Sequence, residues 1–288
     1  MHAQTSAAHA LEQEGDQVET QRARERTDAI RWASLAIAIL AAAWTLFHII
    51  WTLSNHIADD YWGIALLVLF ILALALAVAQ FAQERTTLAG TGKRADNETF
   101  PEPAISKFFL ASTSASAMWL VVRMNVGAEW FTAGWEKVAS PAWGTSGKAL
   151  KGFVAAALVK SSGPNPAVQG WYAWFLQHVV LPNAGLFSVL VSWGEVLVGV
   201  GILVGALTGI AAGFGVLMNF NYLLAGTVSI NPIIGMFGLF LVISWRVCGW
   251  LGLDRILLPA LGLPWKPGAL FQSSRTISTT QRQTRYSS

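Results

Sequence analysis

Cysteine is nearly absent from this 288-residue chain, which contains only Cys248. A single thiol excludes an internal disulfide, a Cys-x-x-Cys redox pair, an iron–sulfur cluster and a cysteine zinc site. Charge is also scarce: charged residues make up 12% of the chain, whereas a globular domain has about 25%. The formal net charge is only +3 and no basic stripe marks a soluble face, which excludes nucleic acid as a partner.

Apolar residues are abundant, because 54% of the chain is hydrophobic, with 14 tryptophans and 15 phenylalanines. So much apolar surface excludes disorder for most of the chain, and its long uncharged runs point to the lipid bilayer. Each run holds about 18–23 mainly apolar residues, enough for a helix to cross about 30 Å of hydrocarbon. We therefore predict an all-α integral membrane protein with six spans, at 32–53, 62–81, within 108–138, 184–207, 210–227 and 232–250.

The charged residues divide the chain and orient it in the membrane. Of the sixteen carboxylates, twelve precede Pro103 and four follow it. Arginine and lysine gather before the first span, between the second and third, and after the last, so the positive-inside rule places both termini in the cytoplasm of a cell-membrane protein. The predicted segments are a polar cytoplasmic tail (disordered or a frayed helix), a transmembrane hairpin, a cytoplasmic linker, a helical bundle and a basic polar tail: 1–31, 32–81, 82–107, 108–270 and 271–288.

The segment between the third and fourth spans, 138–183, is predicted to contain two interfacial helices. Ser146 is placed to cap a helix whose apolar residues share one face, and 167–181 is aromatic but too short to cross a membrane. Four lysines here would lie outside the cell, against the orientation rule: Lys137, Lys148, Lys151 and Lys160. They would attract a dianionic substrate or simply snorkel from amphipathic helices.

Ionisable side chains inside the predicted spans are the strongest functional signal: Arg123, Glu129, Glu195 and Arg246. Each costs roughly 2.5–3.5 kcal/mol near the bilayer centre, so such residues are seldom without a role. Glu195 lies near the midplane, where it is suited to relay a proton. An Arg123–Glu195 pair across adjacent helices is compatible with their depths, either as a functional pair or as a structural ion pair that fixes helix register.

Polar residues of the fifth and sixth spans add further candidates. Asn219 and Asn221 lie about 200° apart on the helical wheel, so one is expected to bind a ligand while the other bonds to a neighbouring helix. Asn231 and Pro232 supply a predicted N-cap and a first-turn proline for the sixth helix. Glycines repeat every fourth residue from 201 to 213, which indicates close helix packing. No motif for haem, flavin, a metal, a dinucleotide or a P-loop is found.

Four runs in the last part of the chain resemble a known family. They are RMNVGAEWFTAGWEK (123–137), GEVLVGVGILVGALTGIAA (194–212), NFNYLLAGTVSINP (219–232) and WRVCGWLGLDRILLPALGLPWKPG (245–268). Together they make residues 108–270 similar to the DoxX/DoxD membrane proteins. The resemblance implies a four-helix DoxX-like bundle, here preceded by an extra N-terminal helix pair. Nine polar residues of this chain match the polar pattern of the family: Arg123, Glu136, Lys137, Glu195, Asn219, Asn221, Asn231, Arg246 and Asp254.

The same resemblance implies an activity like that of a thiosulfate:quinone oxidoreductase subunit, which converts thiosulfate to tetrathionate and passes electrons to membrane quinone. Our leading hypothesis is a membrane oxidoreductase subunit with quinone as co-substrate, a small anionic sulfur compound as donor and a partner redox subunit. The catalytic candidates are Glu195 and Arg123. The candidates for substrate or quinone binding are Asn219, Asn221, Glu129, Glu136, Lys137 and Arg246. Two alternatives stay open: a non-catalytic anchor for a partner enzyme, and a small-solute transporter.

Overall fold

The computed structural model describes residues 2–55, 61–89 and 103–263, and over these residues the chain is helical with no strand. This confirms the predicted all-α class. The elements in chain order are α1 (His2–Asn55), α2 (Tyr61–Ala89), α3 (Ala104–Ala111), η1 (Thr113–Ala115), α4 (Ser116–Ala139), η2 (Pro141–Trp143), α5 (Lys148–Val159), α6 (Gly170–Phe175), η3 (Leu176–Val180), α7 (Ala184–Val204), α8 (Thr208–Leu224), α9 (Asn231–Ile243), α10 (Trp245–Cys248) and α11 (Asp254–Ala260).

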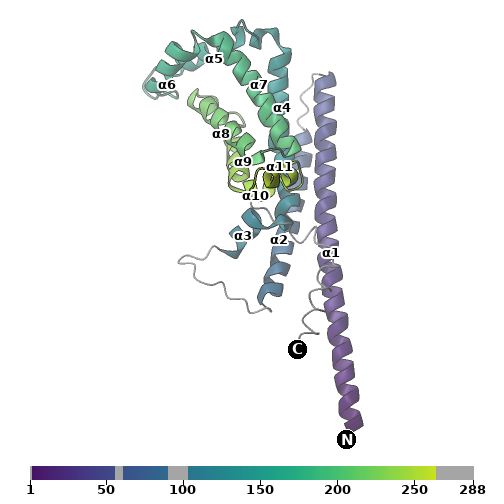
Figure 1. Ribbon diagram of the computed structural model, residues 1–288. Helices are drawn as coiled ribbons and strands as arrows, with labels where there is room; N and C mark the ends of the chain where they lie inside the picture. The colour runs from purple at the N-terminus through teal and green to yellow at the C-terminus, as the bar shows by residue number, and fades with distance from the viewer. Residues whose placement is uncertain (1, 56–60, 90–102, 264–288) are drawn as a thin grey trace.

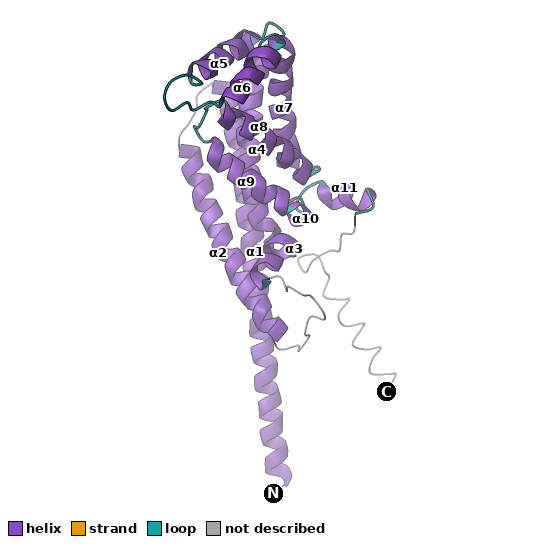
Figure 2. Cartoon of the chain, turned by 90° about the vertical axis from the view of Figure 1, so that its left-hand side faces the viewer, coloured by secondary structure: helices purple, strands orange, loops and turns teal. Residues whose placement is uncertain are grey.

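The N-terminal helix α1 extends far beyond the bundle. Its 54 residues would measure about 80 Å at about 1.5 Å per residue. Figures 1 and 2 show that its N-terminal part projects past the other helices, at the end opposite α5 and α6. The helical alternative for the tail 1–31 is therefore the one observed. A buried hydrogen bond from the Gln80 amide to the Ser34 hydroxyl (2.9 Å) joins α2 to α1.

Helices occupy all six of the predicted ranges, but they differ in length. Glu25–Thr52 and Ala184–Val204 are long and apolar enough to cross a membrane, and α3 with α4 would add a third crossing if that bent pair is one span. Val68–Gln83, α8 and α9 are apolar but shorter. Within the described residues, the structure thus shows two or three helices of full spanning length.

Two of the predicted spans are interrupted by serines. In the third, α3 and α4 meet at 64°, and the Ser112 hydroxyl accepts a hydrogen bond from the Ser114 amide (3.3 Å) at the break. In the sixth, α9 ends before Ser244, whose hydroxyl donates to the Phe240 carbonyl (2.7 Å). Local side-chain bonds of this kind compete with the helical ladder, which explains both breaks.

Other predicted boundaries also shift. The linker 82–107 is shorter than predicted, because α2 continues to Ala89 and α3 begins at Ala104. Asn231 is not the N-cap of α9: it is the first helical residue, and its amide donates to the Thr227 carbonyl (3.0 Å). The proline in the first turn of α9 is confirmed. The tail 271–288 and the end of the segment 108–270 lie outside the described residues.

Helix α4 is the centre of the bundle and contacts α1, α2, α7 and α9. Its buried tryptophans, Trp119 and Trp130, share a core with Ile202 of α7 and Leu241 of α9. Its closest neighbour is α7: a Cβ added to Gly134 would lie 2.6 Å from the Val196 backbone nitrogen. The missing side chain of Gly134 lets the two antiparallel backbones approach, and this close contact sets the register between α4 and α7.

The predicted glycine repeat serves packing at only some of its positions. A Cβ on Gly201 would meet Ala211 at 2.9 Å, and one on Gly209 would meet Trp245 at 2.6 Å. Gly205 instead has φ of +69°, and it ends α7 in the left-handed conformation that favours glycine. Gly213 faces open space, with nothing within 4 Å of an added Cβ. Of the four glycines, two therefore serve helix packing, one reverses the chain and one serves neither purpose.

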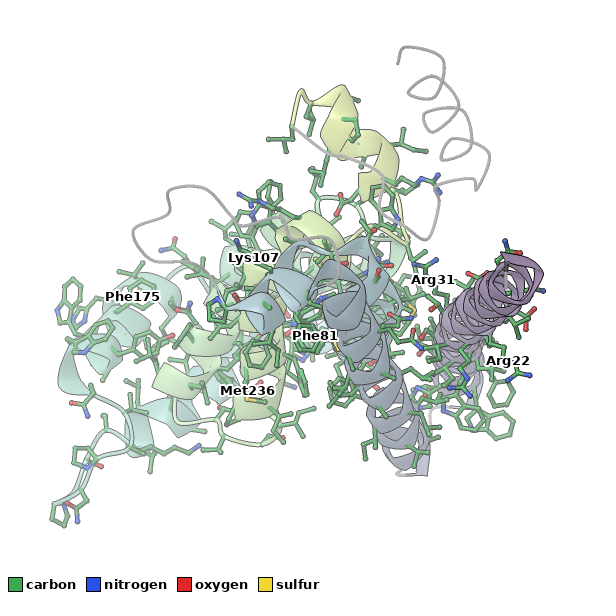
Figure 3. The ribbon with its side chains drawn as sticks, turned by 90° about the horizontal axis from the view of Figure 1, so that it is seen from below. Arg22, Arg31, Phe81, Lys107, Phe175 and Met236 are labelled. Atoms are coloured by element: carbon green, nitrogen blue, oxygen red, sulfur yellow. The ribbon has the colours of Figure 1, made fainter. Side chains whose placement is uncertain are left out.

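Residues 141–181, comprising η2, α5, α6 and η3, fold over one end of the bundle, and we call them the cap (Figure 1). The cap has its own apolar core, which includes Leu150, Val154 and Leu176. The N-cap position of α5 is Gly147 (φ +59°), one residue after the predicted Ser146, but the Ser146 hydroxyl does accept a hydrogen bond from the Lys148 amide (3.5 Å) at the start of the helix. Seen from the opposite end in Figure 3, Phe175 of the cap lies on the side away from α1.

Candidate functional site

Arg123 of α4 is buried, with 1% of its surface exposed, and its guanidinium is fully engaged by backbone. It donates to the carbonyls of Ile202 (2.8 Å) and Leu203 (2.8 Å), and to those of Cys248 (3.1 Å) and Leu251 (3.3 Å). The last carbonyls of a helix have no partner within the helix, and a cation there also complements the helix dipole. Arg123 therefore caps the C-terminal end of α7.

Asp254 binds backbone amides at the start of α8, just as Arg123 binds backbone carbonyls at the end of α7. Its carboxylate accepts hydrogen bonds from the backbone amides of Leu207 (2.5 Å) and Thr208 (2.9 Å). Leu207 has φ of +48°, an unusual conformation that these bonds help to hold. One buried cation and one buried anion thus secure the two helix ends of the α7–α8 turn. The predicted pairing of Arg123 with Glu195 is wrong, because the backbone takes the guanidinium.

Glu195 of α7 finds its partners on two other helices. It is 1% exposed; its Oε2 accepts from Lys137 Nζ at 2.7 Å, and its Oε1 accepts from the Tyr222 hydroxyl at 2.5 Å. Lys137 is in the last turn of α4 and also donates to the Ala133 carbonyl (3.2 Å). These three side chains, Lys137, Glu195 and Tyr222, form what we call the Glu195 site. A buried carboxylate paired and hydrogen-bonded in this way stays within the apolar bundle at acceptable cost.

Aromatic rings surround the Glu195 site. Trp130 of α4 stacks on Tyr222 with centroids 6.4 Å apart, and Phe153 of the cap meets the same ring edge-on at 6.2 Å. Lys137 Nζ lies 5.4 Å from the centre of the Trp143 ring, in cation–π contact. Lys137 is half-buried, with 20% of its side chain exposed, against 2% for Glu195. A line of three hydrogen-bonded polar groups therefore runs from beneath the cap into the bundle.

Asn221 binds the cap, as a structural asparagine would. Its backbone carbonyl and side-chain oxygen accept from the Tyr172 hydroxyl at 3.0 and 3.1 Å, and its amide donates to the Leu217 carbonyl. This is the helix-bridging role predicted for one of the two asparagines. Asn219 is different: it is 2% exposed and faces Gly235 of α9.

The remaining predicted residues lie apart from the Glu195 site. Glu136 is exposed on α4, Glu129 is half-buried on the same helix, and Arg246 is exposed, with its guanidinium 5.5 Å from the Trp245 ring centre. Of the predicted candidates, the structure thus joins Lys137 directly to Glu195. Tyr222 was not predicted from the sequence. Its signal is a lone phenol in the apolar run 210–227, one helical turn beyond Asn219.

The described ranges hold no group of three or more His, Cys, Asp and Glu side chains that could bind a metal ion. Comparison with known proteins adds no family, because no protein-family model, no curated protein and no solved structure matches the chain.

Proposed function

We propose that the chain is a six-span protein of the cell membrane with both termini in the cytoplasm, related to the DoxX/DoxD proteins. Six apolar helical ranges support this, as do apolar side chains exposed on the outward faces of α7, α8 and α9, such as Leu197, Phe214 and Met236. In Figure 3, which views the end where α1 begins, Arg22 and Arg31 mark α1, and Lys107 marks α3. This end carries the cationic residues expected of the cytoplasmic side.

Cysteine labelling tests this topology. In a Cys248→Ser background, Gln21→Cys places a thiol on the exposed first half of α1, and Ser162→Cys places one in the cap. We expect a membrane-impermeant maleimide added to intact cells to label Ser162→Cys, and to label Gln21→Cys only after the cells are opened. Labelling of both variants in intact cells, or the reverse order, would contradict the orientation.

We propose further that the chain is the membrane subunit of an oxidoreductase that reduces quinone with electrons from a small anionic sulfur compound such as thiosulfate. The observation that carries this proposal is the Glu195 site, in which a buried carboxylate bonds to a half-buried ammonium and a half-buried phenol among aromatic rings. Apolar walls with a few convergent polar groups suit the head group of a lipid-soluble quinone.

The chemistry requires both electrons and protons. Two thiosulfate ions form one new sulfur–sulfur bond and release two electrons. A quinone that takes these two electrons also takes two protons and becomes a quinol. Tyr222 can give its proton to the reduced quinone, and Glu195, which bonds to both groups, can then pass a proton from Lys137 to the resulting phenolate. Repeating this transfer supplies the second proton, and Lys137, whose side chain is 20% exposed, takes its replacement from solvent. Cations on the cap favour a dianionic donor: Lys148 and Lys151 are exposed, and Lys160 reaches the Gly226 carbonyl (2.8 Å).

Carboxamide substitution tests the role of Glu195. Glu195→Gln keeps the shape of the side chain but replaces the carboxylate by an amide, which cannot bind and release a proton. We expect thiosulfate-dependent reduction of decylubiquinone in membranes to fall by about 100-fold or more, the usual effect of losing a general acid–base group. The matched control is Glu136→Gln, an exposed carboxylate on α4, which should retain wild-type activity. Equal rates in Glu195→Gln and wild type would remove the assignment.

A second candidate, a non-catalytic anchor for a partner redox enzyme, is favoured by one observation. The N-terminal part of α1 projects beyond the bundle, where a soluble partner could bind it (Figure 2). In this case the partner would carry the sulfur chemistry. Purified chain that reduces decylubiquinone with thiosulfate by itself would exclude the anchor. Activity that appears only when a co-purified partner is added back would favour it.

A further inference from the structure

Asn219 is a buried amide without a partner in the described part of the chain. Only 2% of the residue is exposed, and neither its Oδ1 nor its Nδ2 makes a hydrogen bond there. Nearly all buried polar groups in proteins are hydrogen-bonded, because burying an amide without a partner is unfavourable. Asn221, two residues on, bonds through both its oxygen and its nitrogen. The unfilled donor and acceptor of Asn219 therefore point to a bound group from outside the protein.

Between α8 and α9 there is room for one further heavy atom, the size of a ligand oxygen, beside the Asn219 amide. A Cβ added to Gly235 would meet Asn219 Cγ and Nδ2 at 3.7 Å and Oδ1 at 4.0 Å, which are ordinary van der Waals distances. Three residues along α9, a Cβ on Gly238 would lie only 2.8 Å from Val216. The helices thus approach closely at Gly238 and leave space for a further heavy atom beside the Asn219 amide.

The position of this amide relates it to the Glu195 site. Tyr222 follows Asn219 by three residues, which places the two side chains on one face of α8, about 4.5 Å apart along the helix axis. Next to them on the outer surface, Phe220 of α8 and Met236 and Leu239 of α9 are exposed apolar side chains. A ligand dissolved in lipid would therefore approach this part of the bundle over an apolar surface.

We propose that Asn219 binds an oxygen of the quinone head group between α8 and α9, beside Gly235. Nδ2 donates a hydrogen bond to a quinone carbonyl, and Oδ1 accepts one from a quinol hydroxyl. A neutral amide offers both bonds, so the same residue holds the oxidised and the reduced ligand. This inference rests on the proposed quinone-reducing function and adds the position where the substrate binds.

Decylubiquinone titration of the detergent-purified full chain tests the site, with quenching of tryptophan fluorescence as the signal of binding. Asn219→Leu should raise the Kd for decylubiquinone by about tenfold or more, as expected when a hydrogen-bonding group in a buried site is lost. Its melting temperature should equal or exceed that of wild type, because no protein bond is removed. The matched control, Asn221→Leu on the same helix, should change the Kd less than twofold.

A Kd for Asn219→Leu within twofold of wild type would overturn the inference. A lowered melting temperature would also overturn it, since that would reveal a protein partner for the amide. Gly235→Leu gives an independent test that leaves Asn219 intact: it fills the space and should also raise the Kd, and an unchanged Kd would overturn the site.

The same titration separates this site from the proposed function. If wild type reduces decylubiquinone and Asn219→Leu binds it normally, the function stands and the site is wrong. If wild type binds decylubiquinone through Asn219 but does not reduce it with thiosulfate, the site stands and the proposed reaction is wrong. If wild type does not bind decylubiquinone, both are overturned.

Discussion

Replacing Arg123 by leucine should destabilise the protein strongly, because this arginine joins three parts of the chain. Its guanidinium bonds to carbonyls at the end of α7 and to two carbonyls around the α10 turn. Leucine removes every one of these donors, and its apolar side chain takes the place of the methylene groups of arginine. Of the two freed carbonyls at the end of α7, that of Ile202 keeps only a long hydrogen bond from the Gly205 amide (3.3 Å), and that of Leu203 loses its Arg123 donor.

The magnitude follows from the number of bonds and their burial. Hydrogen bonds to a charged group contribute about 1.5–3 kcal/mol each, but four such bonds on one group are not additive. Removing one partner of a buried charged network typically costs about 3–5 kcal/mol, and we take this value for Arg123→Leu. At about 2–4 °C per kcal/mol, the melting temperature should fall by about 6–20 °C.

Helical circular dichroism during heating in detergent measures this effect. Arg246→Leu is the matched control, because its guanidinium is exposed and lies 5.5 Å from the centre of the Trp245 ring. That contact is worth about 0.5–1 kcal/mol, so the control should melt within about 4 °C of wild type. Arg123→Leu with an unchanged melting temperature would refute the capping role. If Arg123→Leu lost the proposed quinone reduction without losing stability, Arg123 would again be a candidate catalytic residue.

Three further predictions concern the fold. Asp254→Ala removes the cap of α8 and should lower stability by about 1–2 kcal/mol in the same melting assay; no change would contradict the cap. Gly199→Ala inserts a methyl against α4 and should lower the melting temperature, whereas Gly213→Ala, in open space, should raise it or leave it unchanged. Burial raises the pKa of Tyr172 to about 12 from 10.0. The stability difference between wild type and Tyr172→Phe should therefore stay constant up to about pH 10 and disappear as pH rises to about 12; a difference lost by pH 9 would contradict this.

The helical ranges were predictable because the signals for them are local. A run of apolar residues forms a helix in lipid whatever its neighbours are, since every backbone group must be bonded within the segment. Serine and proline mark the boundaries only in part. Ser112 and Ser244 break two predicted spans because their hydroxyls bond to nearby backbone groups, an outcome that depends on a local choice of conformation.

The candidate site was predictable in its residue types and not in its pairings. Buried Glu195 required a partner, and Arg123 was the cation that its predicted depth in the membrane suggested. Arg123 instead satisfies the carbonyls that α7 exposes when it ends at Gly205, and Arg246 lies on the surface. Neither outcome follows from composition, because each depends on which helix end is nearby.

By itself, the sequence determined that the described chain is helical, where its apolar helices lie, and that Glu195 is a costly buried charge that needs a partner. Only the tertiary structure decided which partner, because Lys137 and Glu195 are 58 residues apart and meet through the packing of α4 on α7. Gly134 and Gly199 bring those backbones together at one register. A slip of one helical turn, about 5.4 Å, would carry the carboxylate past both the ammonium and the phenol.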